Sequence, residues 1–263
     1  MSNESSSEML PMVLYGHPHT RVGRVAWLLE ELELPHTIEV IDFFSDQYDH
    51  TNSGNRRVPF LFDPNTESRL FESLAINTWL IQTYGSESTL TPANATEWGD
   101  LFKWSFWAMT ELDMLLFEGL MYNAGVGHLL SNETYYMDYF DRTKTIARRD
   151  RIARELRFPI RVLDSALETG DGWLMGDRFT IADLNVSSVA FWISLQDASD
   201  EPTPMAETFP HFGDWLARCM GRETSPLARI LRDRASGDPR AQIDWARAET
   251  SAENRVGRSG PSS

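Results

Sequence analysis

Residues 55–76, NRRVPFLFDPNTESRLFESLAI, decide how this chain folds. Two apolar segments, VPFLFD and RLF, lie on either side of a polar stretch that contains proline and asparagine, which predicts a β-hairpin. Pro59 stands near the start of the first strand, where its missing N–H is tolerated at a sheet edge or beside a cis bond. Glu72 and Ser73 then begin an expected helix over about 72–84, since acidic and hydroxyl side chains favour helix N-termini.

Each of these features has a structural and a functional interpretation. Pro59 fits an ordinary edge strand, but a cis Val58–Pro59 bond would turn the main chain of Val58 outward, where it can pair with an extended peptide. Glu72 and Ser73 fit as helix-capping residues alone. They also fit a carboxylate site at a helix N-terminus, with the glutamate as the partner of an ammonium group.

The segments before this stretch complete a small α/β unit. MVLY at 12–15 predicts a strand, the apolar spacing within 20–33 predicts an amphipathic helix, and the alternation in HTIEVI at 36–41 predicts a second strand. Residues 43–56 are polar and irregular. The expected order is therefore β-α-β, an irregular segment, and β-β-α.

After a connection rich in Gly, Pro and small polar residues, only helical periodicity follows. The first helix is predicted by an apolar stripe of five residues: Leu101, Trp104, Ala108, Leu112 and Leu115. Further helices are expected over 133–168, from Thr180, over 209–220 and over 225–235. At the start of the third helix, Phe179, Thr180 and Asp183 fit a hydrophobic staple, an N-cap and its reciprocal partner.

The chain is therefore predicted to be an α/β unit followed by an all-α unit. The expected parts are a tail at 1–11, an α/β domain at 12–85, a linker at 86–95, a helical domain at 96–236 and a polar tail at 237–263.

Composition excludes several classes of function. The formal net charge of −15 argues against a binder of nucleic acid or anionic membranes, which depends on positive fields. Cys219 is the single cysteine, so an intramolecular disulfide, a CxxC pair and cysteine-based zinc sites are excluded, and we expect it to be a small buried hydrophobe. The first residues lack the features of a secretory signal, and no apolar run approaches about 20 residues, so a cytoplasmic protein is expected.

Six features along residues 12–226 together resemble the cytosolic glutathione transferase family. They are TRVGRVAWLLEELEL (20–34), Val58-Pro59, ESLAI (72–76), LTP (90–92), GDRFTIADL (176–184) and FPHFGDWLARCMGRETSP (209–226). The resemblance implies an N-terminal thioredoxin-like domain and a C-terminal helical bundle. It implies a bacterial-type member with a Ser/Thr-type rather than a Cys-type active site.

The same resemblance assigns roles in binding glutathione, a γ-linked tripeptide with two carboxylates, one ammonium group and a thiol. Val58, held by Pro59, is expected to pair with the cysteinyl main chain. Ser73 is expected to bind the γ-glutamyl carboxylate, and Glu72 to face the ammonium group. Arg57 is expected to meet the glycine carboxylate.

For catalysis, the family places a donor after the first strand that hydrogen-bonds the glutathione sulfur and stabilises the thiolate. The resemblance implies Thr20 in this role. His19, Tyr15 and a main-chain N–H remain alternative donors. It also remains open that no group activates the thiol. No metal is expected, because His17 and His19 have no carboxylate or cysteine close by in the sequence.

The implied activity is that of a glutathione transferase, in which the thiolate attacks a hydrophobic electrophile, with a role in detoxification. Trp104, Trp107, Met114 or Tyr122 are expected to line the second-substrate pocket. A homodimer is also implied, without nucleic-acid or membrane partners. Two alternatives remain open: a glutathione-dependent disulfide reductase, isomerase or ether-cleaving enzyme, and a non-catalytic interaction or ligand-carrier module.

Overall fold

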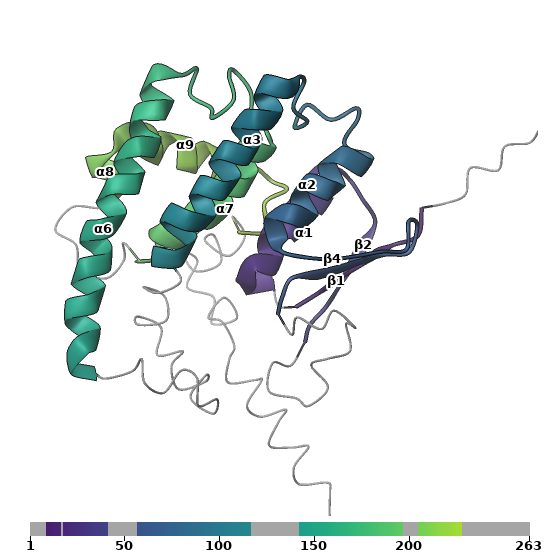
Figure 1. Cartoon of the computed structure of the whole chain (residues 1–263), viewed down its shortest axis with the longest axis horizontal. Helices are drawn as coiled ribbons and strands as arrows, with labels where there is room; N and C mark the ends of the chain where they lie inside the picture. The colour runs from purple at the N-terminus through teal and green to yellow at the C-terminus, as the bar shows by residue number, and fades with distance from the viewer. Residues whose placement is uncertain (1–8, 17, 42–56, 117–141, 197–204, 228–263) are drawn as a thin grey trace, which may run out of the picture. The chain divides into compact units, whose positions relative to one another are not determined.

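The computed structural model describes residues 9–16, 18–41, 57–116, 142–196 and 205–227 (Figure 1). The chain divides into two compact units. The first comprises Met1–Ile76 and Glu223–Ser263, and the second comprises Asn77–Arg222. The boundary between the units falls inside one helix, α2 (Ser73–Tyr84).

The first unit contains a mixed sheet of four strands in the order β2-β1-β3-β4. The strands are β1 (Met12–Tyr15), β2 (His36–Glu39), β3 (Phe60–Asp63) and β4 (Ser68–Phe71). β1 is parallel to β2 and antiparallel to β3, and β3 and β4 form the predicted antiparallel hairpin. The second strand ends at Glu39, two residues before the predicted end. This sheet and its helices confirm the predicted thioredoxin-like domain.

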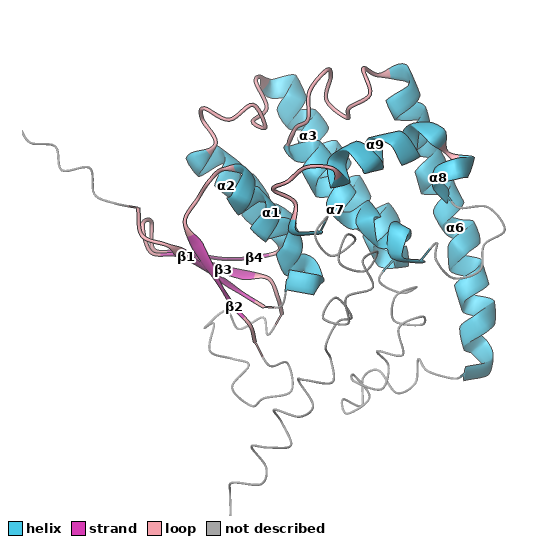
Figure 2. Cartoon of the chain, turned by 180° about the vertical axis from the view of Figure 1, so that it is seen from behind, coloured by secondary structure: helices cyan, strands magenta, loops and turns pink. Residues whose placement is uncertain are grey.

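The core of this unit lies between the sheet and its helices. Figures 1 and 2 show α1 (Gly23–Glu31) and the start of α2 on the same side of the sheet. Leu14 on β1, Leu61 on β3 and Trp27 on α1 are completely buried. Removing such side chains from water is the main force that holds the helix against the sheet.

The first helix begins later than predicted. A single π-helical turn, η1 (Pro18–Val22), precedes α1, and Thr20 within it has non-helical torsions of φ −112° and ψ −165°. The Thr20 hydroxyl accepts a hydrogen bond from the Val22 N–H at 3.3 Å, and this local bond competes with the helical pattern. Regular helix therefore starts only at Gly23.

A segment from the end of the described chain packs on α1 within the same unit. The Thr224 hydroxyl donates to Glu31 Oε1, which also accepts from the Trp27 indole at 3.0 Å. Leu227 is buried, and a Cβ placed on Gly23 would lie 2.9 Å from its Cδ2. Gly23 is therefore needed as a residue without a side chain, so that Leu227 can approach the start of α1.

The described part of the second unit is mainly helical (Figure 2). Its elements are α3 (Ala95–Trp107), the π-helical turn η2 (Ala108–Asp113), α6 (Arg142–Thr169), α7 (Ile181–Gln196), α8 (Met205–Thr208) and α9 (Pro210–Met220). Four residues of the predicted apolar stripe are buried, and the fifth, Leu115, is half-buried. Residues 133–141 and 228–235 of two predicted helices lie outside the described residues.

The predicted capping residues at the start of α7 are confirmed as a buried cluster. Asp183 Oδ2 accepts from the Thr180 N–H and the Thr180 hydroxyl, both at 2.9 Å. Its Oδ1 accepts from the Leu174 N–H at 3.0 Å and the Trp215 indole at 2.9 Å. Phe179 is buried, as expected of a staple residue. One carboxylate thus ties the start of α7 to α9 and to the preceding loop.

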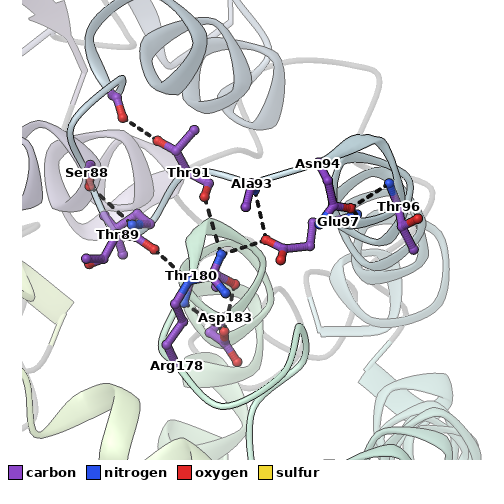
Figure 3. Close-up of polar contacts among 12 residues, drawn as sticks. Ser88, Thr89, Thr91, Ala93, Asn94, Thr96, Glu97, Arg178, Thr180 and Asp183 are labelled. Atoms are coloured by element: carbon purple, nitrogen blue, oxygen red, sulfur yellow. Dashed lines mark hydrogen bonds and ion pairs between the residues drawn. The ribbon is translucent and has the colours of Figure 1, made fainter.

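Arg178 holds the segment before α3 in place (Figure 3). Its guanidinium donates to the Thr89 carbonyl at 3.1 Å and pairs with Glu97 Oε2 at 2.6 Å. Glu97 also accepts from the Ala93 N–H, and the Asn94 side chain caps α3 by accepting from the N–H groups of Thr96 and Glu97.

Among the described residues, no helix combines the length and apolar character needed to cross a membrane.

Candidate functional site

Gly16 directly follows β1 and lies close to two other segments, the residue before α1 and the segment before β3. Its φ of +124° suits glycine and strains other residues. A Cβ there would lie 2.6 Å from Val22 Cγ2 and 2.8 Å from Val58 Cβ. Val58 therefore packs against the turn that leads to Thr20, although the two are 38 residues apart in sequence.

The Val58–Pro59 bond is cis, as predicted. Pro59 is buried and directly precedes β3, whereas Val58 is half-buried and Arg57 is exposed. The proline thus takes no part in the ladder of β3, which begins at Phe60.

Glu72 and Ser73 form the N-terminus of α2. The Glu72 carbonyl accepts the first helical bond, from the Ile76 N–H at 2.9 Å, so Glu72 occupies the N-cap position. Its φ of +69° is unusual for a residue other than glycine and costs about 1 kcal/mol. Glu72 is exposed, and Ser73 is buried with 3% of its surface accessible. A strained backbone at this point places an exposed glutamate at a helix start, where the helix dipole favours negative charge.

Arg24 on α1 reaches the start of α2 and contacts Ser73. Its Nη1 donates to Ser73 Oγ at 3.2 Å, and only 2% of Arg24 is exposed. A guanidinium is always charged, so this bond brings a fixed positive charge to a helix N-terminus that already favours anions. The same contact joins the start of α1, which directly follows the η1 turn, to the start of α2.

The three candidate thiolate donors differ in their surroundings. Thr20 is half-buried, and its oxygen accepts from the Val22 N–H. Tyr15 is half-buried at the end of β1 against the Phe60 ring, and burial together with Glu39 raises the pKa of its hydroxyl. His19 lies in η1, but its side chain is outside the described part of the structure.

The residues expected to line a second-substrate pocket are not equivalent. Trp104 is buried, and its ring meets the half-buried Trp107 edge-on with centroids 5.4 Å apart. Met114 is 65% exposed. Tyr122 lies outside the described residues. The structure thus brings together two of the four aromatic or apolar candidates.

Cys219 is buried in α9, as predicted, and burial raises the pKa of its thiol well above the usual value. A thiol in such surroundings is protonated at neutral pH and is a poor nucleophile. Within the described ranges, no group of three His, Cys, Asp or Glu side chains is arranged to hold a metal ion.

Sequence reasoning missed Gly16 and Arg24 as members of this site. Two signals pointed to them. Gly16 directly follows a strand, and Arg24 shares an i, i+4 face with Leu28 on a helix whose other residues on that side are apolar. A lone charge on the buried face of a helix indicates a specific partner, which here is Ser73.

Two family models match the sequence. The glutathione S-transferase N-terminal domain matches residues 21–83 and the C-terminal domain matches residues 136–223, together more than half of the chain. The glutathione S-transferase-like protein gedE of Aspergillus terreus is 27% identical over 241 residues, which are 86% of this chain and 96% of that protein. The glutathione S-transferase-like protein tpcF of Aspergillus fumigatus is 28% identical over 226 residues, which are 82% of this chain and 93% of that protein.

Solved structures share the fold. Ure2p5 from Phanerochaete chrysosporium, cocrystallised with 1-(S-glutathionyl)-2,4-dinitrobenzene, superposes with a TM-score of 0.70 at 20% sequence identity. The match covers 90% of this chain and 100% of that one.

Proposed function

Because the chain belongs to the cytosolic glutathione S-transferase family, we propose that it is a glutathione transferase that activates glutathione as a thiolate for attack on a hydrophobic electrophile. The α2 N-terminus carries this proposal. There an exposed glutamate with a strained backbone, a serine and a buried arginine combine a site for an ammonium group with a site for a carboxylate. A γ-glutamyl group carries both charges on one carbon atom.

The other parts of glutathione are assigned to residues around the start of α2 and before β3. Ser73 and the main-chain N–H groups of α2 bind the γ-glutamyl carboxylate, and Glu72 binds the ammonium group. Val58 pairs through its main chain with the cysteinyl residue. Arg57, which is exposed, meets the glycine carboxylate.

Thr20 is the donor to the sulfur in this proposal. A hydroxyl oxygen can accept one hydrogen bond while its hydrogen is donated elsewhere, so the bond from Val22 is compatible with a bond to sulfur. Such a bond lowers the pKa of the bound thiol, because it stabilises the thiolate over the thiol.

The second substrate is apolar in this proposal. Trp104 and Trp107 offer aromatic surface suited to such a molecule. The fold neighbour crystallised with a glutathionyl dinitrobenzene supports an electrophile of this kind. The predicted homodimer and cytoplasmic location also stay proposals, and sedimentation velocity tests the first.

Retention on immobilised glutathione and conjugation to 1-chloro-2,4-dinitrobenzene test the proposal. Ser73→Ala should raise the KM for glutathione about tenfold. Thr20→Ala should lower kcat at least about tenfold and raise the pKa of bound thiol, followed by thiolate absorbance, while glutathione is still bound. Thr83→Ala, an exposed change on α2, is the matched control.

Three outcomes separate the alternatives. Full activity in Thr20→Ala would remove Thr20 from the thiolate role. Retention on glutathione without conjugation, but with reduction of a mixed disulfide, would favour a glutathione-dependent reductase. Neither retention nor turnover in the wild type would favour the non-catalytic module.

A further inference from the structure

After α9 the chain returns to the α/β unit, where residues 223–227, the C-terminal strap, pack along α1. At one end of the strap, the Thr224 hydroxyl donates to Glu31, the last residue of α1. At the other end, Leu227 approaches Gly23, the first residue of α1. Only 1% of Leu227 is exposed, so this end of the strap belongs to the packed interior of the unit.

Leu227 reaches α1 at the point where the helix joins the η1 turn. A Cβ placed on Gly23 would lie 2.6 Å from the carbonyl oxygen of Pro18, the first residue of η1, and 2.9 Å from Leu227 Cδ2. The turn and the strap therefore approach the same point of the α1 backbone. A displacement of Leu227 would open space directly beside the turn.

The η1 turn depends on packing of this kind. π-helical turns are rare, and Thr20 within this one has non-helical torsions. The bond from the Val22 N–H to the Thr20 hydroxyl is 3.3 Å long, which is beyond the usual range for such a bond and makes it weak. Val22 is completely buried. The position of the Thr20 hydroxyl is thus determined largely by the side chains packed around the turn.

We propose that the C-terminal strap sets the position of the η1 turn, and thereby the strength of the hydrogen bond from Thr20 to the glutathione sulfur. Leu227 is then a positioning residue, which acts on the sulfur through the turn. This inference rests on the proposed function. A donor stabilises a developing charge only when it is held at the right distance and angle, so a small shift of the turn weakens the bond.

Leu227→Ala tests this role in the full-length protein. It should raise the pKa of the bound glutathione thiol by about 0.5–1 pH unit, followed by thiolate absorbance, with less than about a threefold change in glutathione affinity. At a pH below the wild-type thiol pKa, kcat/KM for 1-chloro-2,4-dinitrobenzene should fall about threefold to tenfold. At a pH above both thiol pKa values the two proteins should converge, because the thiol then ionises without help.

Three further variants separate positioning from stability. Leu227→Met keeps the volume of the side chain and should restore the wild-type values to within about twofold. Thr224→Val removes only the hydroxyl at the other end of the strap, and should shift the thiol pKa in the same direction by less. Leu167→Ala, a buried change on α6 in the second unit, should lower stability and leave the thiol pKa unchanged.

Amide hydrogen exchange of the unliganded protein separates this inference from the proposed function. Leu227→Ala should speed exchange of a peptide that covers residues 18–24 at least about threefold, whereas Leu167→Ala should not. If the wild type fails to bind glutathione, the proposed function is wrong, and this comparison still decides whether the strap holds the turn. Unchanged exchange in Leu227→Ala overturns the inference, and so does an unchanged thiol pKa with glutathione bound.

Discussion

Arg24 Nη1 donates a hydrogen bond to Ser73 Oγ at 3.2 Å, and both residues are almost completely buried. This bond joins α1 to the start of α2, where we place the γ-glutamyl subsite. It brings a positive charge to this helix start and holds the serine oxygen. In the proposed function Arg24 is a positioning residue, because it acts on glutathione through Ser73.

Arg24→Met should therefore weaken glutathione binding about tenfold and lower the free energy of unfolding by about 1.5–3 kcal/mol, since a buried bond to a charged group is lost. Calorimetric titration with glutathione and urea denaturation measure the two effects. A double-mutant cycle with Ser73→Ala should give clearly less than the sum of the single changes. Fully additive losses would mean that the two residues act independently. Arg161→Met, exposed on α6, is the control.

Gly16→Ala should disrupt the junction of Val22 and Val58. The new methyl group would meet Val22 Cγ2 at 2.6 Å, and the φ of +124° is strained for alanine. We expect a loss of at least about 3 kcal/mol in unfolding free energy and of retention on glutathione. Gly99→Ala is the control, because nothing lies within 4 Å of its Cβ position inside α3. That change should instead stabilise the protein by about 0.5–1 kcal/mol.

Asp183→Asn should be nearly as harmful as Asp183→Ala. Both carboxylate oxygens face donors, so an amide would direct its NH₂ group at two of them. We expect a loss of about 3 kcal/mol or more for either variant, measured as the midpoint of urea denaturation. Asp214→Asn, exposed on α9, should change stability by less than about 0.5 kcal/mol. A mild effect of Asp183→Asn would argue against this network.

The Glu97–Arg178 pair should make stability depend on pH. The Arg178 hydrogen bond, followed by the Ala93 N–H, lowers the pKa of the Glu97 carboxyl from its ordinary 4.5. Because the folded-state pKa is below the unfolded one, the contribution is present above about 4.5 and is lost as the pH falls through the folded-state value. At pH 7 the free energy of unfolding of the wild type should exceed that of Glu97→Gln by about 1 kcal/mol, and this difference should shrink below pH 4. A difference independent of pH would exclude the ion pair as its source.

Most of the secondary structure could be predicted from local patterns. The short apolar run at 12–15 predicts the first strand, alternation predicts the strand at 36–41, and turn residues predict the hairpin after Pro59. Spacing predicts the capping pair Thr180 and Asp183. Boundaries were predicted less well. Hydrophobic spacing predicts a helix from residue 20, whereas α1 starts at Gly23, because the Thr20 hydroxyl forms a local bond that no hydrophobic pattern reports.

The candidate site was predicted only in part, for the same kind of reason. Local chemistry makes part of the site recognisable. Glu72 and Ser73 stand at a predicted helix start, and Val58-Pro59 stands at a predicted strand start. Arg24 and Gly16 were not recognised, since their importance depends on partners 49 and 42 residues away. Local spacing marks the two positions but does not identify the distant partners, Ser73 and Val58.

The sequence alone determined the order of the elements, the family and the residues at the strand and helix starts, because these depend on periodicity, on turn and capping chemistry, and on motifs read in order. Only the tertiary structure decided which side chains meet. It placed Arg24 against Ser73, Val58 against Gly16 and Leu227 against Gly23, and it left the Trp104 indole without an acceptor among the described residues. These outcomes depend on burial and on contacts between distant segments, which the packing of the whole fold settles.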